Sequence, residues 1–564
     1  MMTDEPRLAT GATAAPTGSP GPVAAGPARS EGVAKHVGAV SAATFLSRIL
    51  GLLRDQVFAA WFGAGTAADA FNMAFRVPNL VRDLFAEGAM SASFVPTFTE
   101  WRERQGDEAA WALGRQLMST LLAVLLGLCT LGWIFAPQLL GVMAHGFTQV
   151  QGKLELTISL TRIMLPFLPA VALAAAAMGM LNARGVFFLP AFAPALLNIG
   201  MVVFGLSLIP AARSIGWPPI AAMAAGVVLG GVLQFACQLP ALHKLGFRFR
   251  LEVPTWHPGV RRVAFLMLPA TIGLAATQLN IFVSQAIASS FREGSVSWLQ
   301  YAFRLMQLPI GLFGVAVGTV SLPALSRAAA RRDIPALRAT LSESVRLVFL
   351  LTVPAALFLA VMARPIIALL FQHGRFHAVD TIATGDALLM YCVGLPAFAA
   401  VGIFTRAFYA QGDTRTPVQA TFVAVAVNLG LNLLFVGPLA RLGLAHRGLA
   451  LATSVTAMLN LVQLAFRLRR RIGGIDGGRI LRSLGKLVVA SGVTAAGLAA
   501  GLVALGDVSG RGVAFRAAVV AGGALGALVV GGLLMWLLRV EELALLRELV
   551  RSFAGRFRRG PGAA

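Results

Sequence analysis

The chain has little charge and almost no cysteine. Only 13% of its 564 residues are charged, about half the share of roughly 25% found in soluble domains. Each cysteine stands alone inside an apolar run, which excludes a disulfide framework and the paired spacing of a metal site; the three are Cys129, Cys237 and Cys392. The sequence also has no G-x-x-x-x-G-K-[ST] phosphate loop, so ATP hydrolysis by that apparatus is excluded. Energy for any work must come from a gradient, a membrane potential or a partner.

Apolar residues are what the chain has in abundance. They make up 57% of it, and the mean hydropathy of +0.77 excludes a water-soluble protein. The net charge of +23 has the sign expected of a nucleic-acid-binding protein. Most of the bases, however, are arginines in short connectors between apolar runs, where they act as topology signals. We therefore expect a membrane, and no nucleic acid, as the environment of this chain.

Apolar runs of at least 18 residues predict an all-α polytopic membrane protein with about 14 transmembrane helices. The predicted spans are 34–62, 67–99, 117–137, 155–181, 187–210, 218–241, 260–291, 295–325, 340–371, 379–411, 417–440, 446–466, 482–505 and 513–539. We number the connectors between consecutive spans from the N-terminus. Most of the lysine and arginine residues lie in the even-numbered connectors and in both tails. The positive-inside rule then puts both termini in the cytoplasm.

A weak internal repeat divides the membrane region into two halves. The motif Ala74-Phe75-Arg76 recurs as Ala302-Phe303-Arg304, about 230 residues further along, and Asn198-x-Gly200 recurs as Asn428-x-Gly430 at nearly the same offset. An offset of six helices implies two lobes related by a pseudo-twofold axis along the membrane normal. The predicted domains are a disordered cytoplasmic tail at 1–33, an N-terminal lobe at 34–241, a C-terminal lobe at 260–471, an extra helix pair at 482–539 and a basic cytoplasmic tail at 540–564.

Six arginines fall inside predicted spans, where charge is costly. They are Arg48, Arg54, Arg76, Arg82, Arg162 and Arg304. Each costs roughly 2.5 to 3.5 kcal/mol at mid-helix, so together they cannot face lipid. They must line water, pair with acids or meet an anionic ligand.

Ion pairing is one interpretation of these arginines. Asp55 lies two helical turns from Arg48, and Asp69 lies two turns from Arg76, so internal salt bridges or snorkelling would account for several of them. Arg304 has no acid nearby in the sequence. Guanidinium forks hold phosphate oxygens in bidentate geometry. Arginines from both lobes therefore predict a cavity for a pyrophosphate or another multiply charged head group.

Other polar features give weaker signals. Pro78 and Pro96 interrupt the second span, as in a cavity-lining helix that bends or in membrane helices generally. His373 and His377 have the spacing of a metal pair but no glutamate between them, and we predict no metal site and no cofactor. Interhelical hydrogen bonds, or alternatively an ion site, would explain the remaining polar residues: Asn198, Asn428, Gln278, Asn280 and Gln285.

The segment Ser47 to Pro96, SRILGLLRDQVFAAWFGAGTAADAFNMAFRVPNLVRDLFAEGAMSASFVP, resembles the amino-terminal signature of the MurJ/MviN lipid II flippases. These belong to the multidrug/oligosaccharidyl-lipid/polysaccharide exporter superfamily. The similarity continues through Gly294 to Arg327 and through Ala407 to Pro417, and it covers residues 34 to about 540. The resemblance implies fourteen helices in two lobes, with the last two helices forming a groove for a lipid tail.

The resemblance also implies a function. A flippase of this family moves lipid II, the undecaprenyl-pyrophosphate-linked disaccharide-pentapeptide, from the inner to the outer leaflet of the bacterial cytoplasmic membrane. This transport serves peptidoglycan and cell wall biogenesis, and it involves no covalent chemistry. Implied partners are lipid II, membrane lipids and proteins of cell-wall synthesis.

The resemblance further implies a set of substrate-binding residues. They are Arg48, Arg54, Asp69, Arg82 and Arg304, with Ser295 and Ser297. Some family members have acids where this chain has Phe303 and Gln307, so its cavity should be more positive.

Alternative functions make different demands on the sequence. An exporter of another polyprenyl-linked oligosaccharide would need the same arginines, whereas a cation-coupled drug antiporter of the same superfamily would need acids in the cavity. A membrane-embedded glycosyltransferase would need a long polar catalytic loop, and the connectors are too short. A scaffold for cell-wall synthases would suit the basic tail from Arg547 to Arg559 but would leave the arginines within the spans unexplained.

Overall fold

The computed structural model describes residues 27–85, 89–255, 257–437 and 445–544, and every regular element in these ranges is a helix. The first half of the chain contains α1 (Pro27–Phe62), α2 (Thr66–Phe85), α3 (Ala89–Gln105), α4 (Asp107–Met143), a 3₁₀ turn (His145–Gln149), α5 (Lys153–Met164), α6 (Phe167–Ala183), α7 (Phe188–Ser207), α8 (Ile209–Ser214), α9 (Pro219–Ala236), α10 (Leu239–Lys244) and α11 (Pro258–Ser289). The second half contains α12 (Ser295–Pro309), a π turn (Ile310–Gly314), α13 (Val315–Ala330), α14 (Ile334–Val361), α15 (Ala363–Phe371), α16 (Ala378–Ala410), α17 (Arg415–Val436), α18 (Ala445–Ile472), α19 (Gly477–Leu505) and α20 (Val513–Leu537).

Each predicted span coincides with a helix or with a pair of consecutive helices. The span predicted at 67–99 is divided between α2 and α3, and the one at 155–181 is divided between α5 and α6 beside Pro166. Within the described residues, 11 segments are long and apolar enough to cross a membrane, which supports a multi-pass membrane protein. Neither α1 nor α2 is among them; α2 carries Asp69, Arg76, Arg82 and Asp83 within its 20 residues. The total of fourteen crossings stays a prediction, and the basic tail from Arg547 lies outside the described residues.

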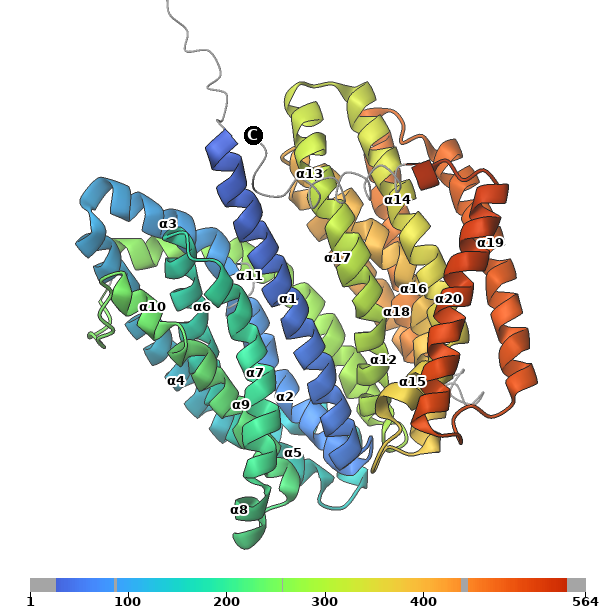
Figure 1. Ribbon diagram of the computed structural model, residues 1–564. Coiled ribbons are helices and arrows are strands. Elements are labelled where there is room, and N and C mark those ends of the chain that lie inside the picture. Colours follow the sequence, from blue (N-terminus) through green and yellow to red (C-terminus); the bar gives the residue numbers. More distant parts are fainter. Residues whose placement is uncertain (1–26, 86–88, 256, 438–444, 545–564) are drawn as a thin grey trace, which may run out of the picture.

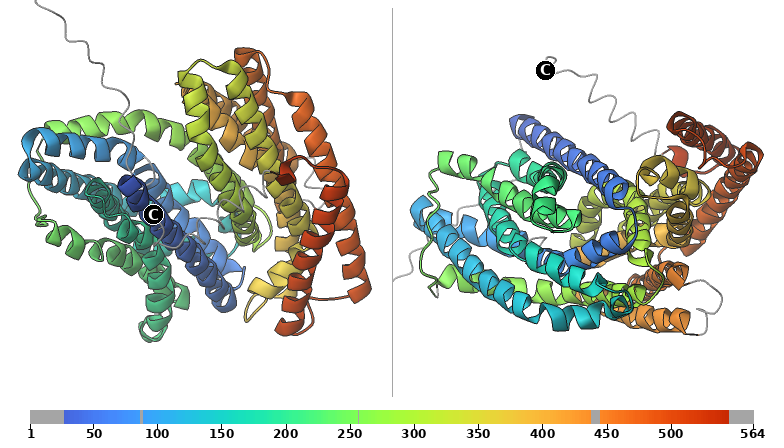
Figure 2. Two further views of the ribbon diagram at one scale, coloured as in Figure 1. Left: turned by 45° about the horizontal axis from the view of Figure 1, so that its top comes forward. Right: turned by 90° about the horizontal axis from the view of Figure 1, so that it is seen from below.

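The helices gather into two groups (Figure 1). One contains α1 to α10, and the other contains α12 to α18 with α19 and α20 along its outer edge. Helix α11 packs along α3 and α4 and also against α17, so it runs from one group to the other (Figure 2). The first group has its own apolar core around Phe94 and Trp111, and the second has one around Phe349 and Phe404.

A third core joins the groups where α1 turns into α2. Phe58 and Phe71 from the first group lie in one buried cluster with Tyr301, Phe371 and Phe376 from the second. In a membrane protein, close packing of such side chains, and not transfer from water, holds helices together. The two groups are therefore held together mainly at this end of the molecule.

Small residues allow the closest helix contact in the first group. Helices α7 and α9 meet at Gly200 and Gly230, and a Cβ atom on Gly200 would overlap the Cα of Gly230. Small residues are typical of membrane helix interfaces because they let backbones approach. This contact fixes the position of α7 beside α1, which it also packs against.

We predict that Gly200→Ala destabilises the protein. The added methyl has no room, and overpacking of this kind costs about 1 to 3 kcal/mol. Gly127→Ala, in α4, is the matched control because a Cβ there would meet nothing within 4 Å. Thermal unfolding in detergent should show a lower midpoint for Gly200→Ala alone. Equal midpoints for the two variants would contradict the proposed close contact.

Candidate functional site

Asp69 joins the two groups of helices at the α1–α2 turn. Its Oδ1 accepts hydrogen bonds from the backbone N–H (3.0 Å) and the hydroxyl (2.7 Å) of Ser297, and its Oδ2 accepts from the Gly294 N–H and from Lys153 Nζ, both at 2.8 Å. The first N–H groups of α12 have no partner within their own helix. A carboxylate from α2 therefore caps α12, where the helix dipole also favours negative charge.

The resemblance implied that Asp69, Ser295 and Ser297 bind substrate. In the structure they lie where α2 meets the start of α12. All three are buried, and Asp69 is only 1% exposed. The Ser295 hydroxyl donates to the Arg292 carbonyl at 2.6 Å. In this conformation their polar groups are occupied by protein partners, so they do not face a cavity. Lys153, which no sequence pattern singled out, is 2% exposed and lies 4.2 Å from the centre of the Phe147 ring.

Further bonds close the same end of the molecule. The Thr66 N–H and hydroxyl donate to Glu293 Oε1 at 2.6 and 2.5 Å, the Arg375 N–H donates to the Ala60 carbonyl at 3.0 Å, and the Tyr301 hydroxyl donates to the Gly63 carbonyl at 3.2 Å. The hydrogen bond from the Thr66 hydroxyl lowers the pKa of Glu293. Glu293 therefore keeps its negative charge to a lower pH than an ordinary glutamate does. We call these contacts, together with those of Asp69, the α1–α2 seal.

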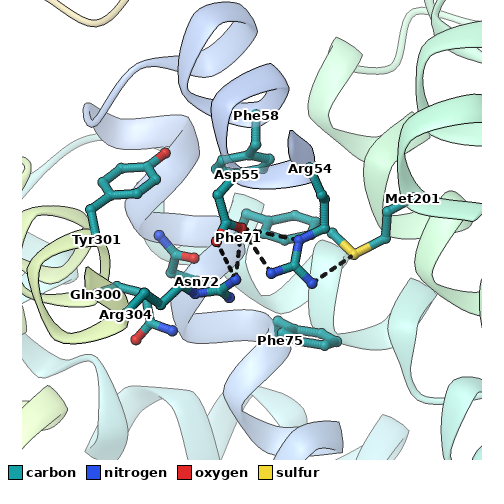
Figure 3. Close-up of a pocket in the computed structure, with 10 residues that line it drawn as sticks. All are labelled: Arg54, Asp55, Phe58, Phe71, Asn72, Phe75, Met201, Gln300, Tyr301 and Arg304. Atoms are coloured by element: carbon teal, nitrogen blue, oxygen red, sulfur yellow. Dashed lines mark hydrogen bonds and ion pairs between the residues drawn. The ribbon is translucent and has the colours of Figure 1, made fainter. Parts of the chain in front are cut away.

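A shared ion pair lies between the two groups, deeper in the molecule than the seal. Asp55 Oδ1 accepts from Arg54 Nε at 3.0 Å and Nη2 at 2.8 Å. Arg304 Nη1, from α12, donates to the same oxygen at 2.7 Å and to Oδ2 at 2.5 Å. Figure 3 shows both guanidinium groups directed at this one carboxylate. Arg54 also donates to Asn198 Oδ1 at 2.8 Å, which ties α1 to α7.

The pairing corrects the expectation that Arg304 has no acidic partner. Asp55 is far away in the sequence, but packing of α12 against the first group brings the two side chains together. The two pairs suggested by helical spacing do not form, because Asp55 binds Arg54 and Arg304 while Asp69 binds Lys153. Arg48 has no ion pair or hydrogen bond within the described part of the chain. Its guanidinium lies against Gly311 in the π turn.

A second polar network connects α2 with α11. Arg82 forms an ion pair with Asp83 at 2.8 Å, and Asp83 Oδ2 accepts from Gln278 Nε2 at 2.9 Å. Arg76 donates to the carbonyl oxygen of the same Gln278 side chain. Arg162, by contrast, is only partly buried and stacks on the Trp133 ring.

Two cavities lie beside the arginines. The larger, about 600 Å³, lies between α1, α12 and the π turn and is lined by Arg48, Asp55 and Arg304 among mostly apolar side chains. The smaller, about 310 Å³, lies inside the first group and is lined by Arg54 and Arg82. Arg54 belongs to α1, which borders both cavities.

The local charge is positive. Among the described residues, this region contains five arginines but only two aspartates. The arginines are Arg48, Arg54, Arg76, Arg82 and Arg304, and the aspartates are Asp55 and Asp83. Uncompensated guanidinium groups at low dielectric attract a multivalent anion strongly. The arrangement is therefore suited to binding a diphosphate between the two groups.

Asn428, another of the predicted polar residues, belongs to a neutral network. Asn428 Nδ2 donates to the Thr456 hydroxyl at 3.0 Å, and Asn432 Nδ2 donates to Asn428 Oδ1 at 2.8 Å and to the Ser284 hydroxyl at 3.0 Å. The ion site suggested as an alternative would receive no negative charge from these side chains. Within the described residues, no cluster of three or more His, Cys, Asp or Glu side chains suited to a metal ion is present.

Comparisons with known proteins agree with the geometry. The family model described as Lipid II flippase MurJ matches residues 58–509. A Burkholderia cenocepacia protein named Lipid II flippase MurJ is 38% identical over 436 residues, which cover 77% of this chain and 83% of the relative. A solved structure of Lipid II flippase MurJ in an inward closed conformation has a TM-score of 0.72 at 26% identity and covers 88% of this chain and 98% of its own. An inward-facing multidrug resistance transporter of the MATE family, with a TM-score of 0.64 at 16% identity, covers 76% of this chain and 96% of its own and shares the fold.

We predict that Lys153→Met weakens the α1–α2 seal. Removing one partner of a buried ion pair costs about 3 to 5 kcal/mol, because it leaves the other charge buried and unpaired. The double variant Lys153→Met/Asp69→Asn should regain part of the loss. Arg104→Met is the control, since its pair with Glu100 is exposed and worth at most about 1 kcal/mol. Thermal unfolding midpoints measure all three, and a Lys153→Met midpoint equal to that of Arg104→Met would refute the prediction.

Proposed function

The chain belongs to the MurJ lipid II flippase family, and from that premise we propose that it moves lipid II from the inner to the outer leaflet of the bacterial cytoplasmic membrane. It does so by alternating access and without covalent chemistry. The observation that carries this proposal is the sharing of Asp55 by Arg54 and Arg304, which places uncompensated positive charge between two groups of helices. A lipid-linked diphosphate is an anion of matching charge.

The seal supports an inward-facing assignment. The start of α1 and the α13–α14 turn lie at the end of the molecule opposite the α1–α2 seal (Figure 1). Arg331 and Arg332 lie in that turn, and the positive-inside rule assigns such residues to the cytoplasm. The closed end then faces outward, and both termini lie in the cytoplasm. Substrate would enter from the cytoplasmic side.

Diphosphate binding would exchange one anion for another. Its oxygens can accept the hydrogen bonds that Arg54 and Arg304 now donate to Asp55, and they can also reach Arg48, which borders the same cavity as Arg304. Arginine binds phosphate in bidentate geometry, so the exchange keeps both guanidinium groups satisfied. Because arginines of both groups would bind the same diphosphate, the two groups of helices would approach each other. This approach would favour the outward-open state.

The remaining parts of the substrate need other surfaces. The polyprenyl tail would stay in lipid along α19 and α20, where many large apolar side chains are exposed, among them Val503, Leu528 and Leu533. A membrane potential, worth about 2.3 kcal/mol per charge per 100 mV, could return the emptied positive cavity to the inward state. Proteins of cell-wall synthesis are proposed partners of the basic tail.

The proposal is tested in cells by switching the protein off and following lipid II in each leaflet. We expect the precursor to accumulate in the inner leaflet and to disappear from the outer one within the time needed to deplete the protein. Unchanged delivery to the outer leaflet, with no other flippase present, would exclude the function.

We predict that Arg304→Lys weakens binding of undecaprenyl pyrophosphate by about tenfold or more. Lysine keeps the charge but loses the fork that matches phosphate oxygens, and charge-assisted hydrogen bonds are worth about 1.5 to 3 kcal/mol. Arg104→Lys, at an exposed position on α3, is the control. Binding to the purified full chain in nanodiscs measures the effect. An affinity equal to that of Arg104→Lys would remove Arg304 from the phosphate site.

We predict the opposite change in affinity for Asp55→Asn. Without the carboxylate, Arg54 and Arg304 lose the anion that competes with diphosphate, so undecaprenyl pyrophosphate should bind more tightly. Transport should slow, because no carboxylate remains to displace the bound diphosphate. Parallel binding and leaflet-resolved transport assays distinguish this result from simple misfolding, which would lower both.

A further inference from the structure

The connector between α10 and α11 is held against α4 by several specific contacts. Glu252 is its main anchor, since Oε1 accepts from Arg115 Nε at 2.7 Å and Oε2 accepts from Gln116 Nε2 at 2.8 Å. The backbone N–H of Glu252 also donates to the Ser119 hydroxyl at 2.9 Å. Phe247 is 1% exposed and belongs to the apolar core of the first group. The connector is therefore a fixed part of the surface.

An apolar cavity of about 350 Å³ lies between this connector and the end of α9. Phe249 forms part of its wall, and its ring centre lies 5.5 Å from that of Phe235 in α9. The other lining residues are Ala236, Leu239, Pro240, His243 and Phe247. Of these lining residues, Ala236, Pro240, His243 and Phe249 are exposed. The cavity can therefore be reached from outside the protein.

The cavity lies where a membrane span ends. Helices α9 and α10 belong to one apolar segment, Pro219–Lys244, that is long enough to cross a membrane. Figure 1 shows α10 at the edge of the first group that lies away from the second. In the connector, Leu251 and Val253 are 61% and 81% exposed. Exposed apolar side chains beside a basic segment are typical of a chain that lies in the membrane interface.

Three basic side chains surround the cavity without a partner of opposite charge. Lys244, Arg248 and Arg250 are exposed, and their side chains form no ion pair or hydrogen bond with any residue that the structure describes. Each is next in the sequence to a residue that lines the cavity. The acid of the connector, Glu252, is already bound to Arg115. Positive charge beside an apolar cavity matches a molecule with an anionic head and an apolar tail.

We propose that this cavity binds an anionic phospholipid of the inner leaflet. An acyl chain lies against Phe249 and Pro240, and the phosphate binds Lys244, Arg248 and Arg250. The positive-inside rule assigns these bases to the cytoplasmic side, where the leaflet carries negative charge that attracts lysine and arginine. Because the connector leads into α11, which packs against both groups of helices, the lipid binds at the junction of the two halves.

The proposed lipid site is separate from the proposed diphosphate site. It shares no lining residue with either cavity beside the arginines of the spans. It also does not require lipid II as the substrate. Variants at the lipid site should therefore leave the affinity for undecaprenyl pyrophosphate unchanged, so the two proposals can fail independently.

The test is photolabelling of the full chain in phosphatidylcholine nanodiscs. Trace phosphatidylglycerol with a diazirine in its acyl chain is added, and labelling of residues 236–253 is measured by mass spectrometry of peptides. We expect more labelling than with the corresponding photoreactive phosphatidylcholine. Arg248→Gln/Arg250→Gln should lower labelling by phosphatidylglycerol about fivefold or more, because each base near an anionic surface is worth about fivefold in affinity, or about 1 kcal/mol.

Two controls separate the cavity from general attraction to charge. Arg331→Gln/Arg332→Gln removes the same charge from exposed positions in the α13–α14 turn and should leave labelling of residues 236–253 unchanged. Ala236→Trp fills the cavity without changing the charge and should lower labelling by phosphatidylglycerol. Ala123→Trp, at an exposed position on α4, is its matched control.

Three results would overturn the proposal. Equal labelling by both lipids in the wild-type chain would mean that any hydrocarbon chain contacts this surface. An equal loss in the two arginine double variants would mean that the whole cytoplasmic face attracts the lipid. A loss in Arg248→Gln/Arg250→Gln without a loss in Ala236→Trp would mean that the head group binds but the cavity is not used.

Discussion

The structure depends on one carboxylate, that of Asp55, which forms ion pairs with two arginines. Asp55 is 8% exposed and Arg54 is equally buried, so each offsets part of the cost of burying the other's charge. Arg304 completes the cluster from the opposite group of helices. A single negative charge between two guanidinium groups satisfies their hydrogen bonds but leaves positive charge in excess. The same interaction therefore joins the two groups and leaves the excess positive charge on which the proposed diphosphate site depends.

The α1–α2 seal follows a different electrostatic rule. Asp69 and Lys153 form a one-to-one pair, and the remaining acceptor positions of the carboxylate are filled by N–H and hydroxyl groups at the start of α12. Nothing is left over to attract a ligand. Buried ion pairs with all partners present are rigid, and removing one partner is costly. The neutral pair thus fits a closure, and the unbalanced cluster fits a binding site.

Helix α1 separates two chemically different spaces. On one side, the cavity shared with α12 is mainly apolar, and Arg48 lies against the glycine of a π turn. On the other side, the cavity within the first group contains Arg82 and two glutamine side chains. Because Arg54 and Asp55 lie on the helix between them, a diphosphate at this point would have distinct surroundings for the groups attached to its two ends.

The helices, the membrane environment and the need of the arginines for an anion could all be predicted from the amino-acid sequence, because long apolar runs and the cost of buried charge are local properties. The segment from Ser47 to Pro96 also predicted the family. Sequence proximity pointed correctly to Asp83 as the partner of Arg82, but the partners of the other acids could not be predicted in this way. Helical spacing pointed to Arg48 with Asp55 and to Asp69 with Arg76, whereas in the folded chain Asp55 binds Arg304 and Asp69 binds Lys153. Such pairings depend on which helices pack together, and Asp55 and Arg304 are 249 positions apart, a separation that no local pattern spans.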